Sequence, residues 1–365
     1  TGEYFNAELC EDVFNIPDAE YLLSDVIQQN LFISQQSGGY RYHQLFRTFL
    51  QTHFKLNQPD AFKSAHRRLA GWYISQNQPD RAIEHFIEAE SIDDAIQLAE
   101  SLVYAYFAQG RTDSILHLSQ RLQVYDIPMP NLDHARAQIY LIDEMNLEQA
   151  QFYAERSLTY FETHQQMNNS YHVMITLGEI HQRRGDILTA QNLFKTILSA
   201  DTLSDSVRSD ALNQLGVAEY YQGDTESAIH HLQASLEITE RTGGLYNRAK
   251  VYQELELVYR DVGDVERAND CLDKQITLWR KLNNPEPLAM ALNNLGYRHY
   301  QQGQYSLAEE AYQQGLDSIS NLLSTRARYY LLASQGDLQR DKGHFHEARA
   351  TYQHALNNPM PMLRC

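Results

Sequence analysis

The stretch LGEIHQRRGDILTAQNLFKTIL, residues 177–198, indicates a repeat fold because four further stretches align with it without a gap. They begin at Leu215, Leu255, Leu295 and Gln335, so successive starts lie 38, 40, 40 and 40 residues apart. Every copy has a glycine eight residues after its start, an alanine five residues later, and a bulky residue four residues after the alanine. A constant period of this length indicates one supersecondary unit repeated along the chain.

Each recurring position has a physical reason. The glycine after eight residues accepts the positive φ that ends a helix, and in three of the five copies Asp follows it, which is a good N-cap for the next helix. Apolar residues spaced by four then form the buried stripe of that second helix. A further glycine stands inside the first helix of four copies, where glycine costs about 1 kcal/mol relative to alanine. We therefore expect close helix–helix approach at these positions, which are Gly178, Gly216, Gly296 and Gly336.

The pattern continues upstream in weaker form, and we count about eight helical hairpins between Ala61 and Leu356. Hairpins that repeat in constant phase stack on their neighbours. The sequence therefore predicts an all-α fold, an α-solenoid wound as a right-handed superhelix. We expect three parts: a partial winged-helix segment at 1–57, degenerate hairpins forming an arm at 58–160, and regular 40-residue repeats at 161–365.

The first sixty residues lack the repeat. We expect a helix over Ala19–Gln29, strands over Leu31–Ile33 and Tyr40–Tyr42 around a turn at 37–39, and a helix over His43–Phe54. Helix, hairpin and helix in this order are typical of the end of a winged-helix unit. Three basic and seven acidic residues give it a charge of −4, the opposite sign to that of a DNA reader, so we expect a structural wing.

The composition excludes several partners. Of 365 residues, 47 are acidic and 30 basic, and the net charge of −17 argues against nucleic acid or an anionic membrane as a direct partner. Three cysteines, far apart, favour a reducing compartment, so we expect a cytoplasmic protein. The sequence begins at Thr1 rather than at an initiator Met, and we expect a piece of a longer protein.

Two resemblances follow from these motifs. The repeated pattern resembles the tetratricopeptide repeat, because it has Leu-Gly, then the turn glycine, then alanine, then Phe, Tyr or Leu. Five ordered motifs resemble the region after the ATPase module of MalT-like regulators. They are FNAELC at 5–10, NLF at 30–32, YRYHQLFRTFL at 40–50, LAGWY at 69–73 and AIEHFIEAE at 82–90. These are STAND-class signal-transduction ATPases, many with a LuxR-type DNA-binding domain. The resemblance implies that this chain holds the winged-helix end and the repeat sensor of such a regulator.

The sequence departs from the family at both catalytic and DNA-binding motifs. It contains no G-x-x-x-x-G-K-[ST] loop and no basic helix-turn-helix at its C-terminal end, so neither function is carried over. No G-x-S-x-G motif occurs, and His344, His346 and His354 lack a cysteine or carboxylate at metal spacing. We expect neither an enzyme nor a cofactor in this chain.

The first helices of the repeats should line the concave groove of the solenoid, with equivalent side chains stacked at 40-residue spacing. Amides offer donor and acceptor together, and Arg and Tyr are frequent at binding hot spots. The candidate ligand-binding residues are Asn213, Gln253 and Asn293 at one level, Tyr220, Arg260, Tyr300 and Arg340 at a second, and the neighbouring Tyr221 and Tyr297. The alternative is a solvated surface whose amides only complement adjacent helices.

Two functions remain open. The first is a non-catalytic sensor region of an ATP-dependent transcriptional regulator, with a small-molecule or peptide inducer, or a partner protein, in the groove. The second is a stand-alone tetratricopeptide adaptor that binds a peptide or protein. The ATPase and DNA-binding modules of the first would lie outside these residues.

Overall fold

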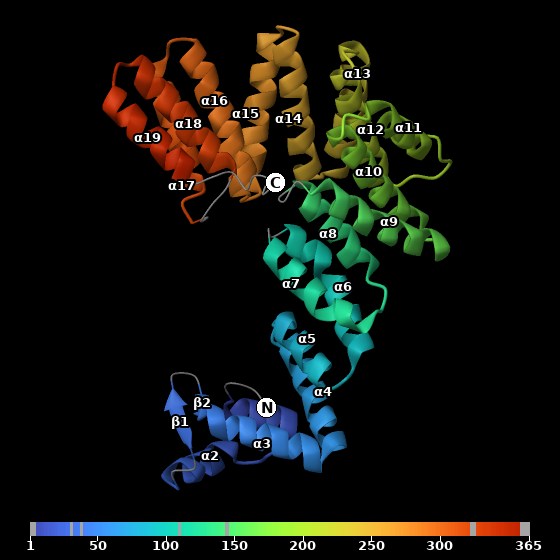
Figure 1. The fold of residues 1–365 in the computed structure, drawn as a ribbon, viewed down its shortest axis with the longest axis vertical. Helices are drawn as coiled ribbons and strands as arrows, with labels where there is room; N and C mark the ends of the chain where they lie inside the picture. The colour runs from blue at the N-terminus through green and yellow to red at the C-terminus, as the bar shows by residue number, and fades with distance from the viewer. Residues whose placement is uncertain are drawn as a thin grey trace. The chain divides into compact units, whose positions relative to one another are not determined.

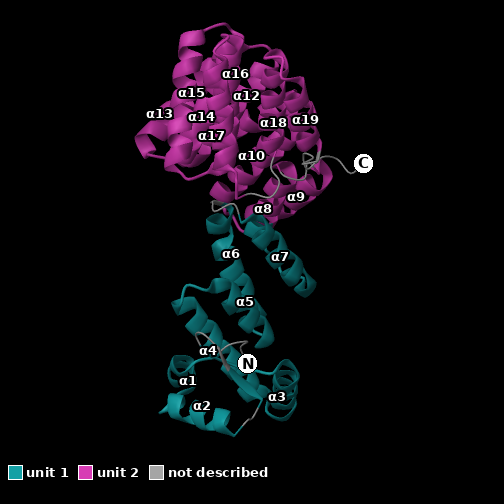
Figure 2. Ribbon diagram, turned by 90° about the vertical axis from the view of Figure 1, so that its left-hand side faces the viewer, with its two compact units in different colours: residues 1–132 teal, residues 133–365 magenta. Residues whose placement is uncertain are grey.

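The computed structural model describes residues 5–29, 32–36, 39–108, 111–142, 146–321 and 326–357. They form two compact units, residues 1–132 and 133–365, which are coloured separately in Figure 2. The predicted all-α solenoid is confirmed, whereas the predicted boundaries after residues 57 and 160 stay predictions. No helix in the described ranges is long and apolar enough to cross a membrane.

The first unit consists of a small helix–hairpin–helix segment followed by two helix pairs (Figure 1). Its elements are α1 (Ala7–Phe14), α2 (Ala19–Gln28), β1 (Ile33–Gln36), β2 (Gly39–Tyr42), α3 (Gln44–Asn57), α4 (Pro59–Ser75), α5 (Pro79–Glu88), α6 (Ile92–Ala108) and α7 (Thr112–Leu122).

The second unit consists of six helix pairs, the first of which begins at the boundary between the units (Figure 1). Its helices are α8 (Pro130–Ile142), α9 (Leu147–Thr163), α10 (Met167–Arg183), α11 (Ile187–Leu198), α12 (Asp205–Tyr221), α13 (Thr225–Thr242), α14 (Leu245–Asp261), α15 (Val265–Lys281), α16 (Pro285–Gln301), α17 (Tyr305–Ser318), α18 (Arg326–Asp341) and α19 (Phe345–Asn357). From α4 to α19 the described residues thus contain the eight expected hairpins.

The first strand of the hairpin near the N-terminus lies later in the sequence than predicted, whereas the predicted second strand, Tyr40–Tyr42, is confirmed within β2. Strands β1 and β2 pair antiparallel from Ile33 opposite Tyr42 to Gln36 opposite Gly39, so the prediction of a strand ending at Ile33 is wrong. The reason is the short connection, which makes the strands pair up to the turn and draws in polar residues that sequence patterns assign to a loop. The predicted turn residues Ser37 and Gly38 lie outside the described residues.

The first helix of each pair forms the inner layer of the second unit. Successive first helices contact one another, α10 with α12, α12 with α14, and α16 with α18, whereas no comparable contact joins successive second helices in the described ranges. In a stack of hairpins, the helices that lie closer together occupy the inside of the curve. We call the surface of α10, α12, α14, α16 and α18 that carries their polar side chains the inner face.

Glycines inside the first helices hold the two helices of a pair together, as expected. A Cβ atom added to Gly296 would lie 2.4 Å from a ring carbon of Tyr312, and one added to Gly178 would lie 2.3 Å from Phe194. The same relation, a glycine and a bulky residue sixteen positions later, joins Gly216 to Leu232 and Gly336 to Tyr352. Atoms cannot approach this closely, so a side chain at any of these glycines would clash. The bulky residue of the second helix already fills that volume.

One repeat departs from this rule. Glu256 stands where the other four have glycine, and it is 5% exposed in the complete structure. Its carboxylate accepts a hydrogen bond of 2.9 Å from Nη1 of Arg260, one turn along α14. Burial raises the pKa of Glu256, and Arg260 opposes that shift. This hairpin therefore carries an ion pair between a buried carboxylate and a half-exposed arginine at the position of the glycine contact in the other repeats.

Replacing Gly296 by alanine should test the glycine–ring contact. Helix propensity alone would stabilise the protein by about 1 kcal/mol, but the clash with Tyr312 should destabilise it by about 1–3 kcal/mol. The matched control is Gly71→Ala in α4, where an added Cβ meets nothing within 4 Å, so this variant should gain stability. Urea unfolding measures both, and a stabilised Gly296→Ala protein would contradict the packing described.

A histidine pair lies between α4 and α5 in the first unit. The Nδ1 atoms of His66 and His85 lie 2.9 Å apart, which allows one shared proton. Phe62 packs on His66 and Tyr73 stacks on His85, with ring centroids 4.4 and 5.1 Å apart. Burial lowers the pKa of His66 to about 3 and that of His85 to about 4. Both rings are thus neutral at pH 7.

Mild acid should loosen this helix pair. Unfolded histidines take up protons below a pKa of about 6.5, whereas the folded pair takes them up only near 3–4, so stability present above pH 6.5 is lost as the pH falls. At pH 5.5 each histidine should contribute about 1.4 kcal/mol, so the loss should be about 3 kcal/mol. Hydrogen exchange of α4 and α5, labelled at one pH after equilibration at pH 7.5 or 5.5, measures it.

Two variants separate the pair from other titrating groups. His66→Leu/His85→Leu should make exchange in α4 and α5 independent of pH over this range. The exposed His43 and His53 serve as controls, and His43→Gln/His53→Gln should keep the dependence of the natural protein. An unchanged pH dependence in the first variant would assign the effect elsewhere.

Candidate ligand-binding face

The predicted amide ladder occupies three first helices of the second unit but not three equivalent environments. Asn213 on α12 is 6% exposed, and among the described residues its Oδ1 atom has no hydrogen-bond donor. Oδ1 of Asn293 on α16 is likewise buried and has no donor among them. Gln253 on α14 is exposed and donates from Nε2 to Oε1 of the adjacent Glu254, at 3.4 Å. Two ladder amides therefore offer an unused acceptor, and the third lies in solvent.

The predicted tyrosines connect neighbouring repeats. The hydroxyl of Tyr220 donates to Asp261, and that of Tyr300 donates to Asp341. The hydrogen bond to Asp261 is the main reason that the pKa of Tyr220 rises to about 12. Both bonds span 41 residues, so the same contact recurs two repeats apart on the inner face.

The remaining candidates differ in their engagement. Arg260 binds Glu256, and Arg340 binds Asp337 and Asp341 at 3.0 and 2.9 Å. Tyr221 and Tyr297 are 63% and 49% exposed, each beside another tyrosine of its own helix. The arginines are thus held by carboxylates of the chain, and the two tyrosines present free ring surface.

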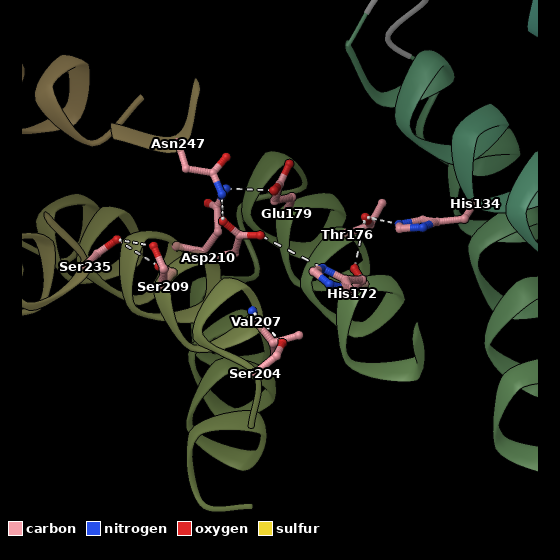
Figure 3. Close-up of polar contacts among 11 residues, drawn as sticks. His134, His172, Thr176, Glu179, Ser204, Val207, Ser209, Asp210, Ser235 and Asn247 are labelled. Carbon is pink, nitrogen blue, oxygen red and sulfur yellow. Dashed lines mark hydrogen bonds and ion pairs between the residues drawn. The ribbon is translucent and has the colours of Figure 1, made fainter. Parts of the chain in front are cut away.

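A polar network that the sequence analysis did not identify crosses three inner helices, and Figure 3 labels three of its members, Glu179, Asp210 and Asn247. Nε2 of Gln214 on α12 donates to Oε1 of Glu179 on α10 at 2.6 Å. Nδ2 of Asn247 on α14 donates to Oδ1 of Asp210 on α12 at 2.9 Å. Lys250 and Glu254 follow on α14. We call these six residues, Glu179, Asp210, Gln214, Asn247, Lys250 and Glu254, the inner polar network.

Helix geometry explains why these side chains meet. Asp210 and Gln214 lie one turn apart on α12, and Lys250 and Glu254 lie one turn apart on α14, so each pair shares a helix face. Asp210 and Lys250, like Gln214 and Glu254, are separated by 40 residues. The repeat period that located the predicted ladder therefore also contained the signal for these positions, one and five residues before each leading leucine.

The electrostatics of the network are those of a recessed surface. The side chain of Asp210 keeps 31% of its exposure, yet burial raises its pKa to about 6 and that of Glu254 to about 7. Burial also raises the pKa of Glu179. Burial opposes the charge of Lys250, but Glu179, Asp210 and Glu254, together with Tyr246, hold its pKa above the usual value. Surrounding protein thus weakens hydration of these groups without sealing them from water.

Histidines extend the polar contacts toward α8. Nδ1 of His172 lies 3.9 Å from Oδ2 of Asp210, and Nε2 of His134 lies 2.9 Å from Oγ1 of Thr176 (Figure 3). Burial lowers the pKa of His134 to about 3 and also lowers that of His172, so neither ring adds a cation at pH 7. Within the described ranges, no group of three or more His, Cys, Asp or Glu residues is arranged to hold a metal ion.

Family models match both parts of the chain. The MalT winged helix domain matches residues 2–62. The tetratricopeptide repeat matches residues 166–241, 207–274 and 245–320. The winged-helix match and the repeat matches confirm the two resemblances read from the sequence.

Individual proteins agree with the domain matches. The chain is 27% identical over 123 residues to the HTH-type transcriptional regulator MalT of Vibrio parahaemolyticus, a match that covers 33% of this chain and 14% of that protein. A STAND protein with a tetratricopeptide repeat sensor from Pyrococcus horikoshii superposes with a TM-score of 0.53 at 16% identity, over 98% of this chain and 48% of that one. The quorum sensor NprR in complex with its cognate peptide NprX superposes with a TM-score of 0.56 at 14% identity, over 96% of both chains.

The chain therefore spans a small part of the curated MalT relative and about half of the archaeal STAND structure. The two structural matches show the fold. The domain matches show a winged-helix domain of the MalT type followed by tetratricopeptide repeats, and the MalT relative and the STAND structure support the resemblance to a fragment of a MalT-like STAND regulator.

Proposed function

We propose that the chain is the sensor region of a MalT-like STAND regulator, that the inner face of the second unit is its ligand-sensing surface, and that the chain itself performs no catalysis and needs no cofactor. The inner polar network carries the proposal. Side chains from α10, α12 and α14 meet there, and partial burial of their charges costs folding free energy. This surface is suited to binding for two reasons. It is maintained at a cost in folding free energy, and it lies between helices whose relative positions define the superhelix.

The supporting structures point in the same direction. The archaeal relative is described as a STAND protein with a tetratricopeptide repeat sensor, and NprR holds a peptide in a chain of the same fold. We infer that the ligand of this chain is a small-molecule or peptide inducer, or a segment of a partner protein. Partners that are nucleic acids or membranes are disfavoured by the net charge of −17.

The mechanism follows from the layout of the repeats. Each hairpin packs mainly on its neighbours, so a ligand that bridges several inner helices changes the angles between hairpins along the array. Such a ligand favours one curvature of the solenoid and thereby shifts an equilibrium between inactive and active forms of the regulator. An adaptor that only presents a bound peptide or protein is the alternative function for the same surface.

A binding screen followed by inner-face variants tests the proposal. Thermal shift of the full chain against oligosaccharides, nucleotides and synthetic peptides identifies a ligand, and calorimetry then compares variants. Gln253→Ala/Asn293→Ala should raise the Kd about tenfold, equivalent to about 1.4 kcal/mol. The melting temperature should stay unchanged because Gln253 is exposed and Oδ1 of Asn293 has no partner to lose.

The control removes two exposed amides from second helices. Asn192→Ala/Gln353→Ala should bind the same ligand as the natural protein does. A ligand that binds both variants equally well would place recognition away from the inner face and refute the proposal. To distinguish regulator from adaptor, the gene is sequenced upstream: a phosphate-binding loop in the same reading frame supports the regulator.

A further inference from the structure

The inner polar network contains more negative than positive groups. Glu179, Asp210 and Glu254 contribute three carboxylates, and Lys250 contributes one ammonium group. Their mutual interactions are electrostatic, since the Lys250 side chain forms no ion pair or hydrogen bond within the described residues. The three carboxylates therefore interact with Lys250 at a distance, without a direct contact to it within the described residues.

The carboxylates also have unused acceptor capacity. The structure gives each of them one side-chain amide donor: Gln214 for Glu179, Asn247 for Asp210, and Gln253 for Glu254. An ionised carboxylate accepts at about four lone-pair sites. The carboxylate oxygens of the network can thus accept further hydrogen bonds from a ligand that carries donors.

An independent observation on the same helix points to a donor ligand. Asn213 is one turn from Asp210 on α12, so these two side chains are neighbours on the helix surface. The side chain of Asn213 is more than nine-tenths buried, at 6% exposure, and its Oδ1 atom accepts no hydrogen bond from the described part of the chain. A buried acceptor without a donor is costly, and a ligand that donates there would remove this cost.

An aromatic ring stands beside the same charges. Tyr246 on α14 interacts electrostatically with Lys250 and is 47% exposed, with one edge of its ring packed on Trp279. An exposed tyrosine ring is a favourable surface for a cation.

We propose that the inner polar network binds the cationic group of the ligand, an ammonium or guanidinium group that lies among Glu179, Asp210 and Glu254. Such groups carry donors and no acceptors, which matches the unused acceptors of the three carboxylates and of Asn213. A neutral polyol would fill the acceptors without neutralising the ionised carboxylates, and those carboxylates would repel an anion. This inference rests on the proposed function and specifies the chemistry of its ligand.

Spermidine and a hexa-arginine peptide are the probes, because a free polyamine and a basic peptide are the two sources of this chemistry. Calorimetry with the full chain at about 0.15 M salt screens long-range attraction by the net charge. We expect hexa-arginine to bind, and the network variant Glu179→Gln/Asp210→Asn/Glu254→Gln to bind it at least about tenfold more weakly. Asp210→Asn alone, a milder change, should weaken binding by a smaller factor if the triple variant fails to fold.

The matched control removes the same charge from exposed positions on second helices, Glu226→Gln/Glu237→Gln/Glu266→Gln, and should change the Kd by less than about twofold. Equal weakening in both triple variants would assign binding to the overall charge and overturn the proposal, as would failure of both probes to bind. Binding of spermidine as well as hexa-arginine, lost only in the network variant, supports a site for free cations. Binding of hexa-arginine alone supports a basic peptide.

The two proposals fail in different ways. If neither probe binds but the screened ligand still loses affinity in Gln253→Ala/Asn293→Ala, the inner face is a binding surface for another chemistry. If the screened ligand binds Gln253→Ala/Asn293→Ala as tightly as the natural protein, the proposed sensing role of the inner face is wrong as well.

Discussion

The close approach of two helices within each hairpin is the constraint on which the rest of the second unit depends. A ring or leucine of the second helix fills the volume next to a glycine of the first, as Tyr312 does at Gly296. Because interiors are close-packed, this contact fixes the distance between the helices. Hairpins of constant geometry then stack with constant rotation, so side chains 40 residues apart recur on one surface. The inner face is thus a consequence of packing that occurs on its opposite side.

The same stacking creates an electrostatic problem on that inner face. Polar residues of three successive helices converge where neighbouring protein reduces hydration, and the carboxyl groups of Asp210 and Glu254 respond with raised pKa values. Amides from the next helix compensate part of this cost, as Asn247 does for Asp210. A fold that only had to stack hairpins would do so with apolar contacts. The remaining cost is the physical basis for assigning ligand binding to this surface.

Neighbouring repeats are also joined by tyrosine–aspartate hydrogen bonds, which recur with the repeat spacing. Tyr220 reaches Asp261 and Tyr300 reaches Asp341 across adjacent first helices. These residues lie at the level predicted for ligand contacts, but in this structure their hydroxyls are committed to the next repeat. A ligand that competes for them would act directly on the angle between two hairpins, which connects binding to the curvature of the array.

The helical hairpins, their number and the glycine positions at which helices approach could be predicted from the amino-acid sequence, because period, turn glycines and buried stripes are local properties of the chain. Phase alone also led to the prediction that Asn213, Gln253 and Asn293 share one level of the first helices. The folded structure was needed to find that Gln253 is exposed while Oδ1 of the buried Asn213 accepts no hydrogen bond from the described residues, and that Glu179, Asp210 and Glu254 interact electrostatically with Lys250. Burial, hydrogen bonding and charge density depend on how far one hairpin rotates over the next, and that rotation is set by side-chain packing between repeats, which no periodic pattern in a single sequence specifies.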